Sequence, residues 1–190
     1  MTKIAVLASY NGSGFKALYE ASQSKEINLE IVLLISNNSN ATALQSACEL
    51  GIETALVNAK TDENPDKKIE KLLHACGCKY VFLSGYMKKL SSNVTNNFKI
   101  INSHPSLLPK YGGEGMYGRF VHEAVIKNQE KESGVTIHEV DENYDEGKVI
   151  LQKKLILSKD ESIESLETKI KKLEQNAIVE AFKNIEKRCL

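Results

Sequence analysis

Short apolar runs alternate with amphipathic segments through the first hundred residues of the chain. Runs of this length are typical of buried strands, and apolar residues that recur every three or four positions are typical of helices. This alternation of strand and helix predicts an open, mostly parallel, twisted α/β sheet with helices on both faces, which is a Rossmann-like architecture. The expected strands are 3–8, 28–35, 53–57, 79–83 and 98–101, and the expected helices are 15–23, 41–50 and 66–76.

The pattern changes after residue 105. Residues 107–119 are rich in glycine and irregular, and residues 120–128 favour a helix. Residues 134–140 and 148–157 favour two strands, which we expect to be antiparallel additions to the sheet. Residues 163–187 form a long charged helix with one apolar face. Because no repeat, low-complexity tract or linker interrupts the chain, we predict a single domain over 1–190, with halves of about 1–100 and about 101–190.

Composition excludes several classes of protein. Lys plus Arg and Asp plus Glu both number 25, which argues against a nucleic-acid protein with a broad basic face. No run approaches the roughly 20 apolar residues of a membrane span, and the N-terminus lacks a signal-peptide pattern. The four cysteines form no CxxC pair, so we expect reduced thiols in a cytoplasmic protein that binds neither nucleic acid nor membrane. No metal-binding motif is present, so no metal is predicted.

The segment Asn11-Gly12-Ser13-Gly14 lies between the first expected strand and helix. Small residues let backbone N–H groups approach an anion closely, and the N-terminus of a helix favours negative charge. The segment is neither GxGxxG nor a Walker A loop. It therefore fits a phosphate site at the carboxyl end of a strand, and it fits an ordinary strand–helix turn equally well.

The segment Asn102-Ser103-His104-Pro105 directly follows the fifth expected strand. Side chains two apart in an extended segment lie on the same face, which brings Asn102 and His104 together. An amide that polarises a carbonyl and an imidazole that moves protons near neutral pH suit acyl-group chemistry. The acidic stretch from His138 to Gly147 is by itself typical of a solvated loop, but Asp145 would favour the imidazolium form of His104 if the two met. We interpret His74 and His122 as structural.

Together these motifs resemble the phosphoribosylglycinamide formyltransferases. The resemblance covers nearly the whole chain and includes KIAVLASYNGSGF, VFLSGYMKKL, NSHPSLLPKY and GVTIHEVDENYDEGKVILQ. It implies formyl transfer from 10-formyltetrahydrofolate, a cosubstrate, to the amine of 5'-phosphoribosylglycinamide in purine biosynthesis. It implies small-molecule substrates as the only partners, and it leaves open a monomer or a homodimer.

The resemblance also assigns residues. It implies a catalytic trio of Asn102, His104 and Asp145, in which Asn102 also contacts the cofactor. The remaining implied positions are Asn11, Gly12, Ser13, Gly14 and Glu174 for the ribonucleotide, and Met87, Lys88, Lys89 and Leu90 for the folate. The chain departs from the family at Ser103, where an Ile is usual, and at Lys88, where an Arg is common. Tyr10 and Gly14 also replace the commoner residues of their loop.

Three other functions fit parts of the same pattern. A methionyl-tRNA formyltransferase shares the Asn-His-Asp set but adds a basic tRNA-binding domain of about a hundred residues, within the usual domain size. A formyltetrahydrofolate hydrolase also shares the set, but its relatives carry a preceding regulatory domain. A binding module that has lost catalysis would bind the same ligands without turning them over. The intact Asn102, His104 and Asp145 argue against it.

Overall fold

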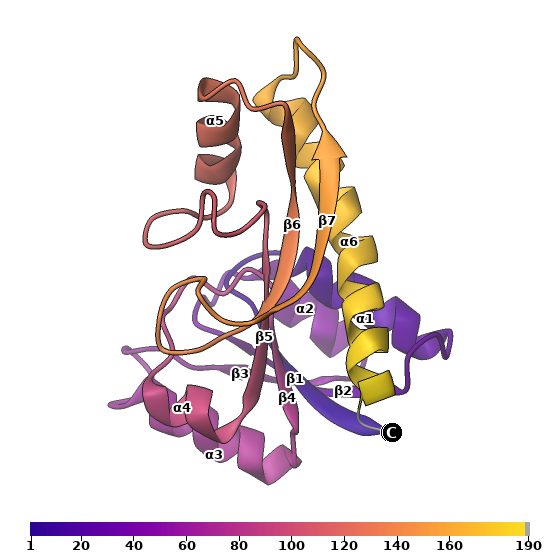
Figure 1. Cartoon of the computed structure of the whole chain (residues 1–190). Helices are drawn as coiled ribbons and strands as arrows, with labels where there is room; N and C mark the ends of the chain where they lie inside the picture. Colours follow the sequence, from indigo (N-terminus) through magenta and orange to yellow (C-terminus); the bar gives the residue numbers. More distant parts are fainter. Residues whose placement is uncertain (189–190) are drawn as a thin grey trace. The chain divides into compact units, whose positions relative to one another are not determined.

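Seven strands and six helices follow one another in the computed structural model, which describes residues 1–188 (Figure 1). The strands hydrogen-bond in the order β3-β2-β1-β4-β5-β6-β7. The pairs β1–β2, β1–β4 and β2–β3 are parallel, whereas β6 and β7 are antiparallel. The predicted fold class, a mostly parallel sheet with helices and antiparallel additions late in the chain, is confirmed.

The contacts divide the chain into two compact units, Met1–Ile101 and Asn102–Leu190, which are called unit 1 and unit 2 below. The boundary coincides with that expected between the two halves, and the single-domain organisation stays a prediction. Unit 1 holds β1 (Thr2–Leu7), α1 (Ser13–Gln23), β2 (Leu29–Ser36), α2 (Thr42–Glu49), β3 (Glu53–Leu56), α3 (Pro65–Cys76), β4 (Tyr80–Leu83), α4 (Ser92–Asn97) and the first half of β5 (Lys99–His104).

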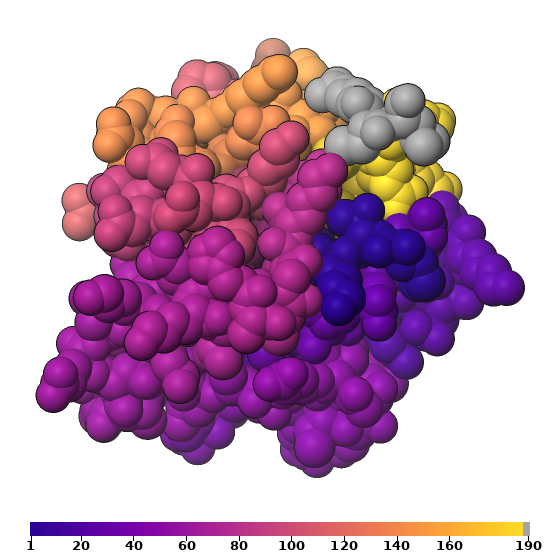
Figure 2. Space-filling model, turned by 90° about the horizontal axis from the view of Figure 1, so that it is seen from below, coloured from indigo at the N-terminus to yellow at the C-terminus, as the bar shows by residue number. Residues whose placement is uncertain are grey.

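The core of unit 1 is made by apolar strands. Residues 4–8 of β1 and its extension are fully buried, and all four residues of β4 are buried beside them. Continuous apolar runs of this kind are expected where helices cover a parallel sheet. The start of the chain, indigo in Figure 2, is in contrast visible at the surface, and Met1 is exposed.

Local sequence signals explain where the helices of unit 1 begin and end. The side chain of Asn64 accepts a hydrogen bond from the N–H of Lys67, and Pro65 occupies the first turn of α3, where its missing N–H costs nothing. Gly77 ends the same helix with a left-handed backbone. Because the apolar residues of α1 recur every three or four positions, one face of that helix is buried.

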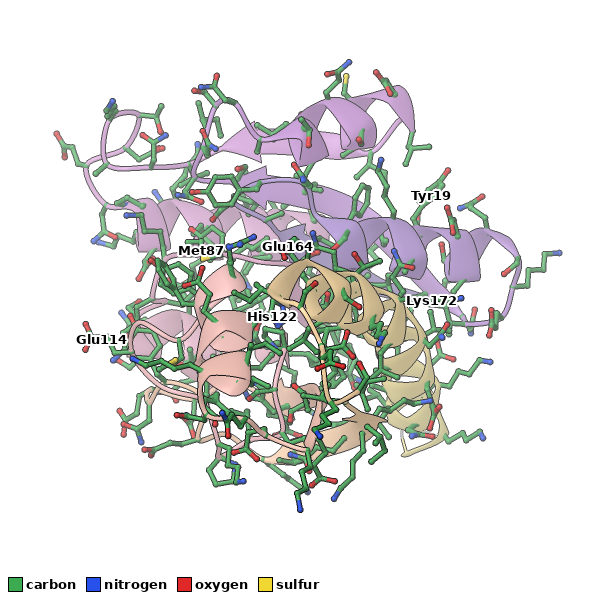
Figure 3. All side chains as sticks on the ribbon, turned by 90° about the horizontal axis from the view of Figure 1, so that it is seen from above. Tyr19, Met87, Glu114, His122, Glu164 and Lys172 are labelled. Carbon is green, nitrogen blue, oxygen red and sulfur yellow. The ribbon has the colours of Figure 1, made fainter. Side chains whose placement is uncertain are left out.

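Unit 2 contains α5 (Arg119–Lys127), the antiparallel pair β6 (Glu132–Glu139) and β7 (Val149–Ile156), and α6 (Ile163–Arg188). Helix α6 packs along β6 and β7 and also contacts α5, as Figure 1 shows. Figure 3 shows His122 on the side of α5 that faces α6, whereas Lys172 points outward from α6. Six residues of β6 are buried in succession, although several of them are polar.

Two sequence predictions are corrected by the structure. The apolar run that stops at Ile101 led us to expect Asn102 and His104 after the strand. Instead β5 continues to His104, so both residues lie within it. The short helix α4 was not expected at all, because Ser92–Asn97 contains only one buried apolar residue, Val94. No helix of the described residues is long and apolar enough to cross a membrane. Cys48, Cys76 and Cys78 are free thiols, and Cys189 lies outside the described residues.

Candidate active site

The last three residues of β5 present side chains to opposite faces of the strand. Asn102 and His104 are two residues apart and share one face, whereas Ser103 lies on the other. His104 is only 3% exposed although it carries two polar ring nitrogens. Because a buried polar group without a partner is costly, each nitrogen needs a defined neighbour.

The neighbours of His104 determine which nitrogen can exchange its proton. Nε2 lies 2.7 Å from the carbonyl oxygen of Tyr111, and because a carbonyl can only accept, Nε2 carries the hydrogen of that bond. Nδ1 lies 3.5 Å from Oδ2 of Asp145. Nδ1 is therefore the nitrogen that can take up a proton, and it faces the carboxylate of Asp145.

Asp145 is held in place by the backbone around it. Its own backbone is left-handed, with φ of 58°, a conformation that Asp tolerates better than most residues. Its Oδ2 accepts a hydrogen bond from the N–H of Gly113 at 2.9 Å. The carboxylate thus connects the loop after β6 to the glycine-rich loop after β5. Its Oδ1 lies 3.6 Å from Nε2 of His138.

Asn102 is oriented by a second buried histidine, His138 on β6. Nδ2 of Asn102 lies 3.1 Å from Nε2 of His138, and Nδ1 of His138 lies 2.8 Å from the carbonyl oxygen of Glu139. Since that carbonyl accepts, Nδ1 carries the hydrogen and Nε2 is left to accept from the Asn102 amide. Burial lowers the pKa of His138, although the Glu139 carbonyl and Asp145 act in the opposite direction, so the neutral ring is favoured.

Gly147 allows the backbone near His138 to adopt this arrangement. A Cβ atom at position 147 would lie 1.8 Å from the carbonyl oxygen of Glu139, where no side chain fits. The same carbonyl accepts the hydrogen bond from His138, and the N–H of Glu139 donates to the carbonyl of Lys148. The glycine of the Asp145-Glu146-Gly147 sequence is therefore required by close approach of two backbone segments.

Ser103 contacts Glu174 of α6 from the other face of β5. The hydroxyl of Ser103 donates to Oε1 of Glu174 at 2.6 Å. Loss of solvent raises the pKa of the Glu174 carboxyl, whereas the Ser103 hydrogen bond and nearby Lys171 lower it. Glu174 is assigned to the ribonucleotide by resemblance, and one of its carboxylate oxygens already accepts a hydrogen bond from within the protein.

The expected phosphate loop has the backbone of an anion site. Gly12 precedes α1 with a left-handed φ of 58°, and a Cβ there would lie 3.1 Å from Cβ of Ala43. Within residues 1–188, no hydrogen bond occupies the N–H groups of Gly12, Ser13 and Gly14, whereas that of Phe15 is bonded to Ser84. The side chain of Asn11 accepts a hydrogen bond from Thr42 at the start of α2.

The segment expected to line the folate site follows β4 in unit 1. Met87, Lys88 and Lys89 are exposed, whereas Leu90 is buried. The N–H of Met87 donates to the hydroxyl of Ser9, which itself donates to Asn37, so the start of the segment is fixed by hydrogen bonds within the unit. Among residues 1–188, no three His, Cys, Asp or Glu side chains gather to hold a metal ion.

The structure brings Asn102, His104 and Asp145 together within unit 2. Asp145 lies beside His104, and His138 lies between Asn102 and Asp145. His138 was not assigned a role from the sequence, although it stands in the quoted segment GVTIHEVDENYDEG. The alternation of side chains along the expected strand 134–140 would have placed it on the same face as Thr136, another buried polar residue. The carbonyl of Tyr111 and the N–H of Gly113 carry no such signal, because backbone contacts depend on loop conformation.

Comparison with known proteins places the chain in a defined class. A family model described as formyl transferase matches residues 2–182, so the chain belongs to the formyl transferase family. Within this family, the chain is 36% identical over 179 residues to the phosphoribosylglycinamide formyltransferase of Haemophilus influenzae, covering 92% of this chain and 82% of that protein. The resemblance inferred from the motifs is thus confirmed.

Two further comparisons agree. The chain is 34% identical over 184 residues to the chloroplastic phosphoribosylglycinamide formyltransferase of Vigna unguiculata, covering 94% of this chain. It spans 59% of that plant protein's length. The crystal structure of phosphoribosylglycinamide formyltransferase from Bacillus halodurans superposes with a TM-score of 0.89 at 26% identity, covering 97% of this chain and 95% of that one.

Proposed function

We propose that this protein transfers the formyl group of 10-formyltetrahydrofolate to the amine of 5'-phosphoribosylglycinamide in purine biosynthesis. The observation that carries the proposal is the hydrogen-bonded set of Asn102, His104, Asp145 and His138, in which each ring nitrogen has a defined role. The family and the relatives described above support formyl transfer over other acyl chemistry.

The geometry supports direct transfer without a covalent intermediate on the protein. Attack of the amine on the formyl carbon produces a tetrahedral oxyanion, which needs a hydrogen-bond donor. The amide of Asn102 has two hydrogens on Nδ2, and because His138 accepts only one, the second is available for the oxyanion. His104 takes the amine proton on Nδ1 and supplies a proton to the departing folate nitrogen, while Asp145 stabilises the intervening imidazolium.

Substrate binding is divided between side chains and backbone in this proposal. The open N–H groups of Gly12, Ser13 and Gly14 receive the phosphate at the N-terminus of α1, beside Asn11. Glu174 contacts the ribose through the oxygen that Ser103 leaves free. The family resemblance assigns the folate to Met87, Lys88, Lys89 and Leu90 and also to Asn102. We further propose a cytoplasmic enzyme that acts on these small molecules without a metal.

One assay tests the proposed reaction. Purified protein is mixed with glycinamide ribonucleotide and a 10-formyl folate, and the deformylated folate is followed by its absorbance. We expect turnover only when both substrates are present. Loss of formyl groups without the ribonucleotide would instead identify a hydrolase, and tight binding without turnover would identify a binding module.

A matched pair of histidine variants completes this assay. His104→Gln removes the imidazole at the centre of the site, whereas His74→Gln removes an imidazole whose side chain is 63% exposed on α3. Only the first substitution should abolish turnover. Equal loss in both variants would contradict the assignment of the chemistry to unit 2.

A further inference from the structure

The contact between Ser103 and Glu174 reaches the strand that carries both Asn102 and His104. We propose that Ser103 is a positioning residue, whose hydrogen bond to Glu174 fixes the last three residues of β5 for the reaction; this inference rests on the proposed function. The proposal concerns the position at which, by the family resemblance described above, this chain has Ser in place of the usual Ile.

Strand geometry makes Ser103 the natural anchor for its two neighbours. Because successive side chains alternate across a strand, the bond to Ser103 holds the backbone from the face opposite Asn102 and His104. Neither neighbour can shift along or rotate with the strand without stretching a bond that is only 2.6 Å long. A strand end restrained from both faces holds its side chains more closely than one restrained from a single face.

The chemistry of the contact makes it strong. A hydroxyl that donates to a carboxylate forms a charge-assisted hydrogen bond, which is shorter and stronger than a bond between neutral groups. Burial raises the pKa of the Glu174 carboxyl, and the Ser103 hydrogen bond acts against this rise by favouring the ionised form. Lys171, one turn earlier on α6, acts in the same direction as this hydrogen bond. An Ile at position 103 would fill the space without restraining Glu174.

Kinetics on a set of Ser103 variants test the proposal. Removal of a hydrogen bond to a charged group should lower kcat about tenfold in Ser103→Ala, with little change in KM for the ribonucleotide. Ser103→Thr keeps the hydroxyl and suits a strand, so it should retain most of the activity. Ser133→Ala is the control, because Ser133 is a buried serine on β6 whose hydroxyl has no partner among residues 1–188.

A double-mutant cycle separates positioning from substrate contact, since Glu174 is also assigned to the ribose. Glu174→Ala alone should change KM and kcat, but if Ser103 acts through Glu174, adding Ser103→Ala should lower kcat no further. Fully additive losses in kcat would overturn the proposal. So would a Ser103→Ala variant whose only defect is a raised KM for the ribonucleotide.

Hydrogen exchange provides a readout that does not depend on turnover. In Ser103→Ala the amides from Asn102 to His104 should exchange faster than in the native protein, whereas Ser103→Thr and Ser133→Ala should leave their exchange unchanged. Unchanged exchange in Ser103→Ala would overturn the positioning role. If the native protein failed to transfer formyl groups, the proposed function would fall, and the exchange data would still decide what Ser103 does.

Discussion

The two units bury polar side chains of different kinds. In unit 1 the buried polar residues are serines, and three of them, Ser9, Ser36 and Ser84, lie at or just after the ends of parallel strands. In unit 2 they include His104, His122 and His138, and no histidine of unit 1 within the described residues is buried. A serine hydroxyl can shape a loop, but only an imidazole changes its charge near neutral pH.

This difference fits the separate roles, in binding and in proton transfer, that we propose for the two units. The hydroxyls of Ser9 and Ser84 accept hydrogen bonds from the backbone N–H groups of Met87 and of Phe15 in the first turn of α1. In unit 2, carbonyl groups fix the protons of His104 and His138 instead. Unit 1 therefore has the features of a binding scaffold, and unit 2 has those of a proton-transfer site.

The largest expected effect comes from removing the central imidazole of unit 2. His104→Ala should lower kcat by about 10²- to 10⁴-fold, the usual contribution of general acid–base catalysis, with the fold retained. Steady-state kinetics at saturating concentrations of both substrates and circular dichroism measure the two properties. Near-normal turnover by this variant would show that the proton is moved by another group.

A smaller effect is expected from neutralising the carboxylate beside that imidazole. Asp145→Asn keeps an oxygen that can accept from Gly113, and Asn tolerates the left-handed backbone, so the structure should be preserved. The substitution removes the carboxylate that stabilises the imidazolium formed during proton transfer, so kcat should fall roughly tenfold or more. An unchanged kcat at saturating concentrations of both substrates would contradict this assignment.

In unit 1 the predicted effect concerns binding alone. Gly12→Ala places a Cβ in a left-handed position and should raise KM for the ribonucleotide several-fold, with kcat nearly unchanged. Gly51→Ala is the control, because Gly51 is also left-handed, has open space around it and follows α2 away from the loop. Each substitution should cost about 1–2 kcal/mol of stability, but only Gly12→Ala should change KM. Equal KM values for the ribonucleotide in the two variants would contradict the proposal that the Gly12 loop binds its phosphate.

The smallest effect concerns stability against pH, and it should originate in unit 2. Burial lowers the pKa of His122 and of His138 below the ordinary value of 6.5. As the pH falls below about 6.5, the unfolded chain binds protons that the folded imidazoles do not, so the free energy of unfolding decreases. Melting temperatures between about pH 8 and about pH 5 should fall by a few degrees, and less so in His122→Leu. A steeper fall in the variant would contradict this origin.

The sequence predicts unit 1 better than unit 2, and the reason is physical. Apolar runs such as residues 79–83 determine buried strands wherever they occur, so the parallel part of the sheet could be predicted from local pattern. The end of β5 could not, because Asn102 and His104 are polar and their strand geometry depends on pairing with the rest of the sheet. The trio was assigned by resemblance, whereas the roles of Tyr111 and Glu139 come from backbone atoms that every residue possesses.

Gly147 has a chemical consequence that its size alone would not suggest. Its backbone is not left-handed, so the absence of a side chain matters only because the Glu139 carbonyl occupies that space. That carbonyl selects the tautomer of His138, and the tautomer in turn decides whether the ring accepts from Asn102 or competes with it as a donor. A methyl group at position 147 would displace that carbonyl and so remove the acceptor that holds the hydrogen on Nδ1 of His138.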